Sequence, residues 1–313
     1  MKTAIIIGCD GQDGRIAFDQ LTEQGSRVLG LGVGKVRSSG VSWDVPVDIT
    51  QSQDVEDVLK AVRPDEVYYL AAYHHSSQDQ VSAEVDLYNK SHDINGRGLL
   101  HFLEGIRAQG LKTKLFYASS SLIFGTPAGE VQNEETPFAP DTVYGISKLN
   151  GLLLCRYYRV KYGIFSSVGI LYNHESPYRL NKFISKKITT AAVNILNKQQ
   201  DILIVGDLNA EVDWGWAPDY VDAMTRILKL DTPDDFIIAS GEKHSVREFV
   251  AVTFGMLGLS WENFVKEDQG LMTRKRKAMV GDASKLKRLT SWHPRVDFKG
   301  MVKLLLQAQG VDL

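Results

Sequence analysis

The sequence predicts an α/β fold in which a doubly wound parallel sheet is followed by a smaller C-terminal α/β lobe. Short apolar segments alternate with helical patterns throughout the first half of the chain, and this alternation is typical of βαβ units with a parallel sheet. The first segment, residues 4–7, is fully apolar, as expected of a strand buried on both faces. A glycine-rich turn follows it directly. The second half has shorter strand-like pieces, which indicates a separate, smaller lobe.

The elements are expected in the following order. In the first half we predict strands at residues 4–7, 27–31, 66–70, 114–118 and 166–171, and one that ends at Pro46-Val47-Asp48. The helices between them cover residues 11–23, 52–62, 85–109 and 143–162. In the second half we expect helices at 182–197, 246–257 and 298–308, and short strands at 202–205, 213–216 and 236–239.

Composition excludes several classes of protein. The 313 residues carry a formal net charge of −2, so no overall field favours nucleic acid or an anionic membrane. No stretch reaches the ~18 apolar residues that a membrane span needs. Only two cysteines occur, Cys9 and Cys155, which favours a reducing compartment over a disulfide framework. We therefore expect a cytoplasmic protein without a metal site, and with no nucleic acid or membrane as partner.

The turn Gly8-Cys9-Asp10-Gly11-Gln12-Asp13-Gly14 lies between the first strand and the first helix. In that setting the glycines allow a backbone to approach a pyrophosphate, and the helix N-terminus supplies amide donors. Asp13 can alternatively complement the helix dipole. The turn predicts a Rossmann-type dinucleotide-binding domain over residues 1–171, with the chain returning to it near 205–224 and 236–240. Residues 172–313 would form the substrate-binding lobe. The predicted cofactor contacts from the turn are Gly8, Gly11, Gln12, Asp13 and Gly14.

The choice between NAD and NADP depends on the end of the second strand. An acid there would hold the ribose 2′-hydroxyl of NAD, but the segment reads Leu29-Gly30-Leu31-Gly32-Val33-Gly34. Lys35 and Arg37 follow closely, which favours NADP over NAD, although the three glycines leave the path of the loop open. Further along the chain, predicted contacts to the adenine and to the central part of the cofactor are Asp48, Ile49, Ala71, Ala72 and Tyr73.

Tyr144 and Lys148 are four residues apart on a predicted helix, so both side chains project from the same face. A nearby ammonium favours tyrosinate and is expected to lower the pKa of the phenol from about 10 toward neutrality. Tyr144 is then a candidate proton donor or acceptor at a carbinol or carbonyl oxygen. Ser120, at the end of the strand at 114–118, is the third member of this predicted set.

These features together resemble the extended short-chain dehydrogenase/reductase family, and within it GDP-mannose 4,6-dehydratase and its relatives. The likeness covers almost the whole chain and is carried by the glycine turn and by specific strings, Asn173-His174-Glu175-Ser176-Pro177, Asp213-Trp214-Gly215, Asp219-Tyr220-Val221 and His244-Ser245-Val246-Arg247-Glu248-Phe249. The resemblance implies a nucleotide-sugar substrate and a role in polysaccharide biosynthesis. It also implies a homodimer through the helices at 85–109 and 143–162.

The resemblance assigns roles to the site residues. Ser120 would hydrogen-bond the C4 oxygen of the sugar, with Ser121 as an auxiliary donor. Tyr144 would exchange the proton on that oxygen, and Lys148 would hold the nicotinamide ribose. The family's 4,6-dehydratases carry a glutamate two residues after the serine, where this chain has Leu122. Because leucine cannot transfer a proton, we predict that 4,6-dehydration is not efficient here.

Another acid could replace the missing glutamate. The candidates are Glu134 and Glu135 on the loop before the tyrosine helix, and His74 and His75 after the fourth strand. A histidine in a cofactor cleft is a possible base, and His75 is the second choice for an acid/base role. The alternative for each is a polar residue on a ligand-facing loop with no proton to move.

The nucleotide contacts differ from the family pattern as well. An arginine precedes Asp-Trp-Gly in the dehydratases, and this chain has Val212 there. Trp214 could stack on a base or sugar, and the alternative is core packing of the lobe. A guanine base is what the family suggests. The predicted substrate-binding set is His75, Asn173, Arg179, Lys182, Lys187, Trp214 and Arg274.

The sequence therefore predicts an NAD(P)-dependent oxidoreductase acting at C4 of a nucleotide-activated sugar, as a 4-dehydrogenase or 4-keto reductase. Three alternatives remain. One is a 4-epimerase that uses the same residues, and another is a 4,6-dehydratase with a relocated acid. The third is a cofactor-binding protein without catalysis, against which the intact Ser-Tyr-Lys set argues.

Overall fold

The computed structural model describes residues 1–73, 83–268, 270 and 278–313. Within these residues the largest sheet has seven strands in the order β11-β7-β5-β4-β1-β2-β3. Every neighbouring pair is parallel except β2 with β3. The predicted doubly wound α/β fold is thereby confirmed. The strand bounds are β1 (Thr3–Ile7), β2 (Arg27–Gly32), β3 (Lys35–Ser39), β4 (Glu66–Tyr69), β5 (Lys114–Ser120), β7 (Ser166–Leu171) and β11 (Asp235–Ile238).

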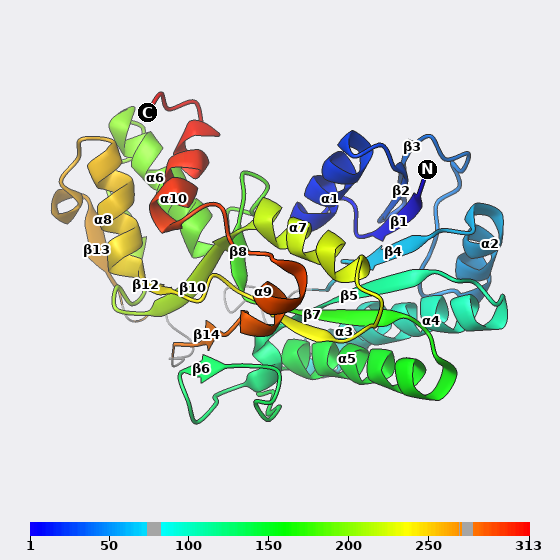
Figure 1. The fold of residues 1–313 in the computed structure, drawn as a ribbon. Helices are drawn as coiled ribbons and strands as arrows, with labels where there is room; N and C mark the ends of the chain where they lie inside the picture. Colours follow the sequence, from blue (N-terminus) through cyan, green and yellow to red (C-terminus); the bar gives the residue numbers. More distant parts are fainter. Residues whose placement is uncertain (74–82, 269, 271–277) are drawn as a thin grey trace.

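Helices cover both faces of this sheet (Figure 1). Alternate residues of a strand point to opposite faces, and β1 shows the consequence. Ile5 and Ile7 are buried against α2, α4 and α5, whereas Ala4 and Ile6 are buried against α1, α7 and α9. The helix bounds are α1 (Gln12–Glu23), α2 (Ser52–Val62), α4 (Gly98–Ala108), α5 (Val143–Tyr162), α7 (Ala217–Leu228) and α9 (Ser284–Thr290).

The helix expected at residues 85–109 is divided into three parts. It begins as α3 (Glu84–His92), continues through a π-helical turn η1 (Asp93–Arg97) and ends as α4. A π-helical turn inside a longer helix often marks a functional position. Here it carries the buried Asn95, which contacts α5.

The third strand is where the prediction was wrong. Residues 46–48 form no strand, and β3 instead runs antiparallel to β2 directly after a tight turn. Gly32 pairs with Lys35, so only Val33 and Gly34 connect the two strands. Gly34 has φ of +63°, a conformation that glycine adopts without steric cost. The glycines that left the path of this loop unpredicted therefore allow the chain to turn back.

The second lobe is built around a three-stranded sheet. In it β10 (Glu211–Trp216) lies between β8 (Asn173–Glu175), which is parallel, and β12 (Lys243–Ser245), which is antiparallel. Three helices pack together over a separate apolar core, and they are α6 (Ile184–Leu196), α8 (Val246–Met256) and α10 (Phe298–Gln307). Short pairs complete the fold: β9 (Leu203–Val205) with β13 (Val265–Glu267), and β6 (Val131–Gln132) with β14 (Val280–Gly281).

The chain crosses between the large sheet and the second lobe more than once. After β10 it enters α7, which packs against α1 on the large sheet, and β11 then forms the edge of that sheet beside β7. Helices α7 and α9 were not predicted from the sequence. Among the described residues, no helix is long and apolar enough to cross a membrane.

Candidate active site

The glycine-rich turn connects β1 to α1 at the carboxyl edge of the large sheet. Gly8 has φ of +89°, and a Cβ added to it would lie 2.7 Å from the backbone nitrogen of Ala71. A Cβ at Gly14 would lie 2.1 Å from the carbonyl oxygen of Gly8. Side chains are therefore excluded where the turn meets the start of α1. This bare backbone at a helix N-terminus fits the pyrophosphate of a dinucleotide.

The side chains of Gln12 and Asp13 contact the second lobe. Gln12 donates from Nε2 to the carbonyl of His174 at 3.0 Å and accepts at Oε1 from Ser176 at 2.8 Å. The Asp13 carboxylate lies 3.0 Å from Nε2 of His174. Both residues were predicted as cofactor contacts, but their side chains are committed to the segment around His174. We expect only their backbone amides to face the cofactor.

His174 has hydrogen-bond acceptors on both ring nitrogens. Nδ1 lies 2.6 Å from the carbonyl oxygen of Tyr172, and Nε2 faces the carboxylate of Asp13. Because a carbonyl and a carboxylate only accept, both nitrogens must donate, as in an imidazolium. Burial opposes this charge, but Asp13 outweighs it and raises the pKa of His174. Burial acts against the Asp13 carboxylate too, and His174 nevertheless lowers the pKa of Asp13.

Ser120, Ser121 and Leu122 follow one another at the end of β5. The backbone turns there into a short 3-10 helix, η2 (Ser121–Phe124), and Oγ of Ser120 accepts its Leu122 amide at 3.3 Å. Ser121 is buried, and Leu122 is partly buried. A Cβ at Gly145 would lie 2.5 Å from the carbonyl oxygen of Leu122. This close approach brings Leu122 beside the residue that follows Tyr144.

Tyr144 lies in the first turn of α5, and Lys148 one turn later. Lys148 is 1% exposed, and its Nζ donates to the carbonyl of Ala118 on β5 at 2.8 Å. Nζ is 5.8 Å from the centre of the Tyr144 ring. Oγ of Ser147 donates to the carbonyl of Tyr144 at 2.8 Å and accepts from Asn95 Nδ2 at 2.9 Å. The helix that carries the pair is thus fastened to both β5 and η1.

The expected fall in the pKa of Tyr144 was wrong for this structure. Burial raises the pKa of Tyr144 well above its ordinary value, although the charge of Arg179 acts in the opposite direction. Burial also lowers the pKa of Lys148 to about 7, against the influence of Asp13. Removing both groups from water disfavours tyrosinate and ammonium alike.

Several predicted substrate contacts gather around β8 and the start of α6. Arg179 forms an ion pair with Glu175 at 3.2 Å, and its guanidinium lies 3.6 Å from the centre of the Phe183 ring. Its charge reaches both Tyr144 and Asp13. Asn173 is exposed at the start of β8, and Lys182 and Lys187 are partly exposed around the start of α6. His75 and Arg274 lie outside the described residues.

Trp214 is not placed for substrate stacking, so that prediction was wrong. It is 3% exposed and packs in the core of the second lobe against Phe249 and Phe298, with ring centres 5.1 and 6.1 Å away. Its neighbour Asp213 is equally buried, and its carboxylate accepts from the amides of Gly241 and Gly281 at 3.2 and 3.1 Å. The Asp-Trp-Gly string therefore stabilises the lobe.

The remaining predicted cofactor residues differ in what they contact. Asp48 is exposed and accepts from the amide and hydroxyl of Thr50, at 2.9 and 2.7 Å. The carbonyl of Ile49 lies 2.9 Å from Nδ1 of His101. Ala71 lies against Gly8, as described above, while Ala72 is exposed and Tyr73 partly so.

Sequence reasoning missed two residues in this region. Asn95 holds Ser147 from a π-helical turn, and no sequence pattern announces such a turn. Asp10 lies within the glycine turn, and its carboxylate reaches the end of β2, as described below. The sequence did contain an indication of this role, because Asp10 is a charged residue at a variable position of the glycine motif.

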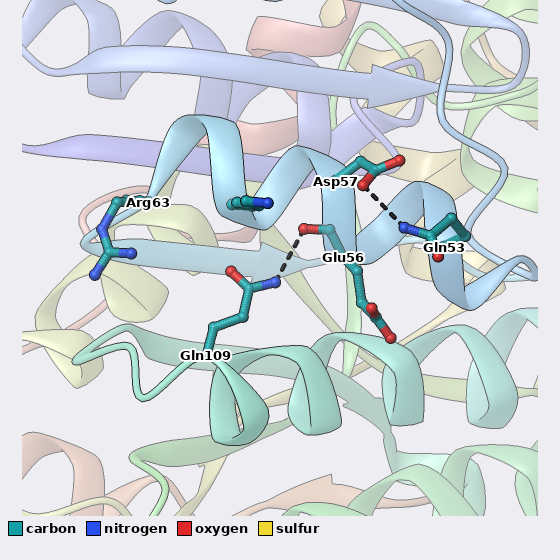
Figure 2. Close-up of a pocket in the computed structure, with 6 residues that line it drawn as sticks. Gln53, Glu56, Asp57, Arg63 and Gln109 are labelled. Atoms are coloured by element: carbon teal, nitrogen blue, oxygen red, sulfur yellow. Dashed lines mark hydrogen bonds between the residues drawn. The ribbon is translucent and has the colours of Figure 1, made fainter.

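A hollow away from the predicted residues lies between α2 and α4 (Figure 2). Within it Gln109 donates to the carbonyl of Glu56 at 2.9 Å, and Gln53 donates to Asp57 at 2.9 Å. Arg63 and Lys60 complete the lining. Apart from Gln109, which is partly buried, these are exposed polar side chains, and none belongs to the predicted site.

Comparison with known proteins agrees with this architecture. A family model described as GDP-mannose 4,6 dehydratase matches residues 5–305. GDP-mannose 4,6 dehydratase 2 of Arabidopsis thaliana is 37% identical over 329 residues, covering 97% of this chain and 86% of that protein. The Vibrio cholerae GDP-mannose 4,6-dehydratase is 37% identical over 281 residues, covering 83% and 73%. The chain belongs to the GDP-mannose 4,6 dehydratase family and is an enzyme of this nucleotide-sugar class.

Solved structures share the fold at lower identity. RMD from Pseudomonas aeruginosa, in a complex with NADPH, superposes with a TM-score of 0.84 at 21% identity, covering 98% of both chains. The dTDP-glucose 4,6-dehydratase of Bacillus anthracis, in a complex with NAD, gives 0.83 at 18% identity, covering 99% of this chain and 97% of that one. They confirm the predicted Rossmann-type architecture.

Proposed function

We propose that this protein oxidises or reduces C4 of a nucleotide-activated sugar, most simply a GDP-sugar, as a 4-dehydrogenase or 4-keto reductase. The observation that carries the proposal is Leu122, an aliphatic residue two positions after Ser120 whose backbone carbonyl closely approaches Gly145, the residue that follows Tyr144. Relatives named for GDP-mannose support the substrate class. The side-chain-free backbone around Gly8 and Gly14 supports a dinucleotide cofactor.

Each residue of the set has a role that its surroundings support. Ser120 Oγ, at the partly exposed end of β5, orients the C4 oxygen, and Ser121 is an auxiliary donor. Tyr144 gives or takes the proton on that oxygen. Burial raises the pKa of Tyr144, so the phenol is protonated near neutrality, and this is the form that donates to a ketone during reduction. Lys148 holds the nicotinamide ribose, and a bound nicotinamide would supply or accept the hydride.

Water elimination needs a group that takes the C5 proton and delivers a proton to the C6 hydroxyl. Leu122 offers none, and losing a general acid/base typically costs ~10²–10⁴-fold in rate. Glu134 is a poor replacement because its Oε1 accepts the amide of Ile237 on β11 at 2.9 Å. Glu135 is exposed on the loop before α5. Within the part of the chain that the structure describes, which does not include the candidates His74 and His75, these contacts support a reaction that stops at C4.

The proposal is tested by incubating the purified protein with cofactor and with matched 4-hydroxy and 4-keto GDP-sugars. We expect an absorbance change from the nicotinamide that requires sugar, with no loss of water from the product by mass spectrometry. Tyr144→Phe should lower kcat by ~10²-fold or more, because its proton is missing. Absence of any absorbance change with both kinds of sugar would refute the proposal.

A second candidate function is 4,6-dehydration with a relocated acid, and the family match favours it. Its signature is a 4-keto-6-deoxy product from GDP-mannose, lighter by one water. The variant Leu122→Glu separates the two candidates: it should add a trace of elimination to a dehydrogenase and change a true dehydratase little. A 4-epimerase, which needs the same residues, would invert C4 without net change in the cofactor.

We also propose a homodimer formed through α3 and α5. These helices contact each other, and both expose large apolar side chains. On α5 the exposed fractions are 49% for Leu153, 48% for Tyr157 and 85% for Val160, and on α3 Val85 is 68% exposed. A second copy would cover this surface by an isologous contact.

A cytoplasmic location is proposed on the chemistry of the thiols. Cys9 and Cys155 are both buried and unpaired. Burial raises the pKa of Cys9 to about 11, so its reactive thiolate form is suppressed. Unpaired structural cysteines suit a reducing compartment.

A further inference from the structure

We propose that Asp10 selects NAD over NADP by holding the adenosine ribose hydroxyls and repelling a 2′-phosphate. This inference rests on the proposed dinucleotide function and names the cofactor for it. It replaces the preference for NADP that Lys35 and Arg37 suggested in the sequence.

Asp10 lies in the glycine turn and reaches across to the end of β2. The amides of Gly8 and Cys9 both donate to the carbonyl of Leu31, at 2.8 and 3.3 Å, and fasten the turn to β2. A Cβ added to Gly32 would lie 2.2 Å from Oδ2 of Asp10. The carboxylate therefore occupies the space over the last residue of β2. Any side chain at Gly32 would displace it.

The end of β2 is where dinucleotide-binding folds distinguish the two cofactors. An acid there accepts hydrogen bonds from the ribose hydroxyls of NAD, whereas a cation there accommodates the 2′-phosphate of NADP. β2 itself ends without an acid. Asp10 brings a carboxylate to the same place from the neighbouring turn. Charge-assisted hydrogen bonds to hydroxyls would favour NAD, and repulsion between like charges would disfavour NADP.

Of the two cations that the sequence suggested for a 2′-phosphate, Arg37 is engaged elsewhere. Arg37 forms an ion pair with Asp19 at 2.7 Å, and its guanidinium lies 3.9 Å from the centre of the Phe18 ring. It pairs with Gly30, two residues before the end of β2. Arg37 is therefore held against α1. Lys35 pairs with Gly32 and remains exposed at the tip of the turn between β2 and β3.

The experiment measures the dissociation constants of NADH and NADPH separately, by fluorescence titration of the purified protein without sugar. We expect the wild type to bind NADH at least ~10-fold more tightly than NADPH. Asp10→Asn should reduce the ratio of the NADPH to the NADH dissociation constant by ~10-fold, which is the usual scale for a charge-assisted hydrogen bond. Raising the ionic strength should narrow the ratio for the wild type, because salt screens an exposed repulsion.

Two further variants test whether the effect on the ratio of dissociation constants is specific to Asp10. Asp231→Asn removes an exposed carboxylate at the opposite edge of the sheet, since its neighbour Leu230 accepts from Lys114 at the start of β5. It should leave the ratio unchanged. Arg37→Ala should leave NADPH affinity unchanged if Arg37 is held by Asp19 and Phe18.

The possible outcomes separate this inference from the proposed function. Equal or tighter binding of NADPH by the wild type overturns the selection of NAD, and so does a ratio that Asp10→Asn leaves intact. Loss of NADPH affinity in Arg37→Ala would overturn it as well, because it would show that Arg37 binds the 2′-phosphate. If neither dinucleotide binds, the proposed function itself fails. The thermal unfolding of each variant, measured alongside, confirms that Asp10→Asn is folded.

Discussion

His174 shows how one side chain can join two distant parts of this chain. Its ring is stacked on Tyr220, with centres 4.6 Å apart, and both nitrogens donate to acceptors. One acceptor, Asp13, belongs to the turn that we propose for the cofactor. The charge on His174 is therefore stabilised by a residue in the first turn of α1.

The first prediction concerns the pH dependence of this pair. The pKa of His174 is raised above its ordinary 6.5, so the stability that the pair contributes is fully present below about pH 6.5 and is lost as pH rises through the folded-state pKa. The pKa of Asp13 is lowered below its ordinary 3.8, so the contribution is present above that value and is lost as pH falls through the folded-state pKa. The pair is intact between these limits.

Asp13→Asn should accordingly lower the free energy of unfolding by ~1–3 kcal/mol near pH 6, the usual scale for a hydrogen bond to a charged group. The deficit should shrink in alkaline solution. Urea denaturation at several pH values measures this loss in the free energy of unfolding. Asp231→Asn, which removes an exposed carboxylate, is the control and should not show the same change with pH. A deficit that is independent of pH would mean that the pair is not ionised.

At the scale of elements, α5 is placed by close packing on β5. Gly151 of α5 lies over Tyr117 of β5: a Cβ at Gly151 would be 2.2 Å from the phenol oxygen. That oxygen donates to the carbonyl of Asn95 in η1 at 3.1 Å. One tyrosine thus sets the distance between helix, strand and π-helical turn. Because Lys148 is on the same helix, this packing also fixes the predicted catalytic pair.

The second prediction tests that packing. Gly151→Ala should lower the free energy of unfolding by ~1–3 kcal/mol, because overpacking a filled core forces neighbours to move. The matched control is Gly255→Ala in α8, where an added Cβ meets nothing within 4 Å. It should stabilise by ~0.5–1 kcal/mol through helix propensity. If the two variants had equal effects on thermal unfolding, Tyr117 would be able to move aside at little cost, and the prediction would be wrong.

At the scale of the whole molecule, two apolar cores flank the large sheet and a third fills the second lobe. Asp213 links them, since its carboxylate accepts from Ser240 after β11 and from Gly281 of β14. Burial raises the pKa of Asp213 despite these hydrogen bonds. The proposed dimer surface on α3 and α5 lies on the side of the sheet that α7 does not cover.

The third prediction is that Leu153→Glu converts a dimer to a monomer. A charge at the centre of an apolar interface has to be desolvated without a partner, which opposes association. Light scattering after size-exclusion chromatography measures the mass. Leu289→Glu, at a residue 48% exposed on α9, is the matched control and should leave the mass unchanged. A wild-type monomer, or a dimer that survives Leu153→Glu, would contradict the proposed interface.

Local patterns by themselves determined much of this protein. The alternation of apolar and helical segments predicted the parallel sheet, and α5 begins and ends where its pattern does, between a Thr142 cap and Gly163. The glycine turn between β1 and α1 was equally readable, because its function lies in its backbone. Such features depend on neighbours in sequence, so a single chain reveals them.

The tertiary structure decided what depends on contacts between distant residues. Only folding showed that β3 turns back beside β2, that Trp214 is covered by Phe249 and Phe298, and that Asp10 reaches Gly32. The raised pKa of Tyr144 was likewise visible only in the folded structure, because exclusion of water by the surrounding fold outweighs nearby charge. Desolvation and packing are properties of the assembled molecule, and no local spacing of residues encodes them.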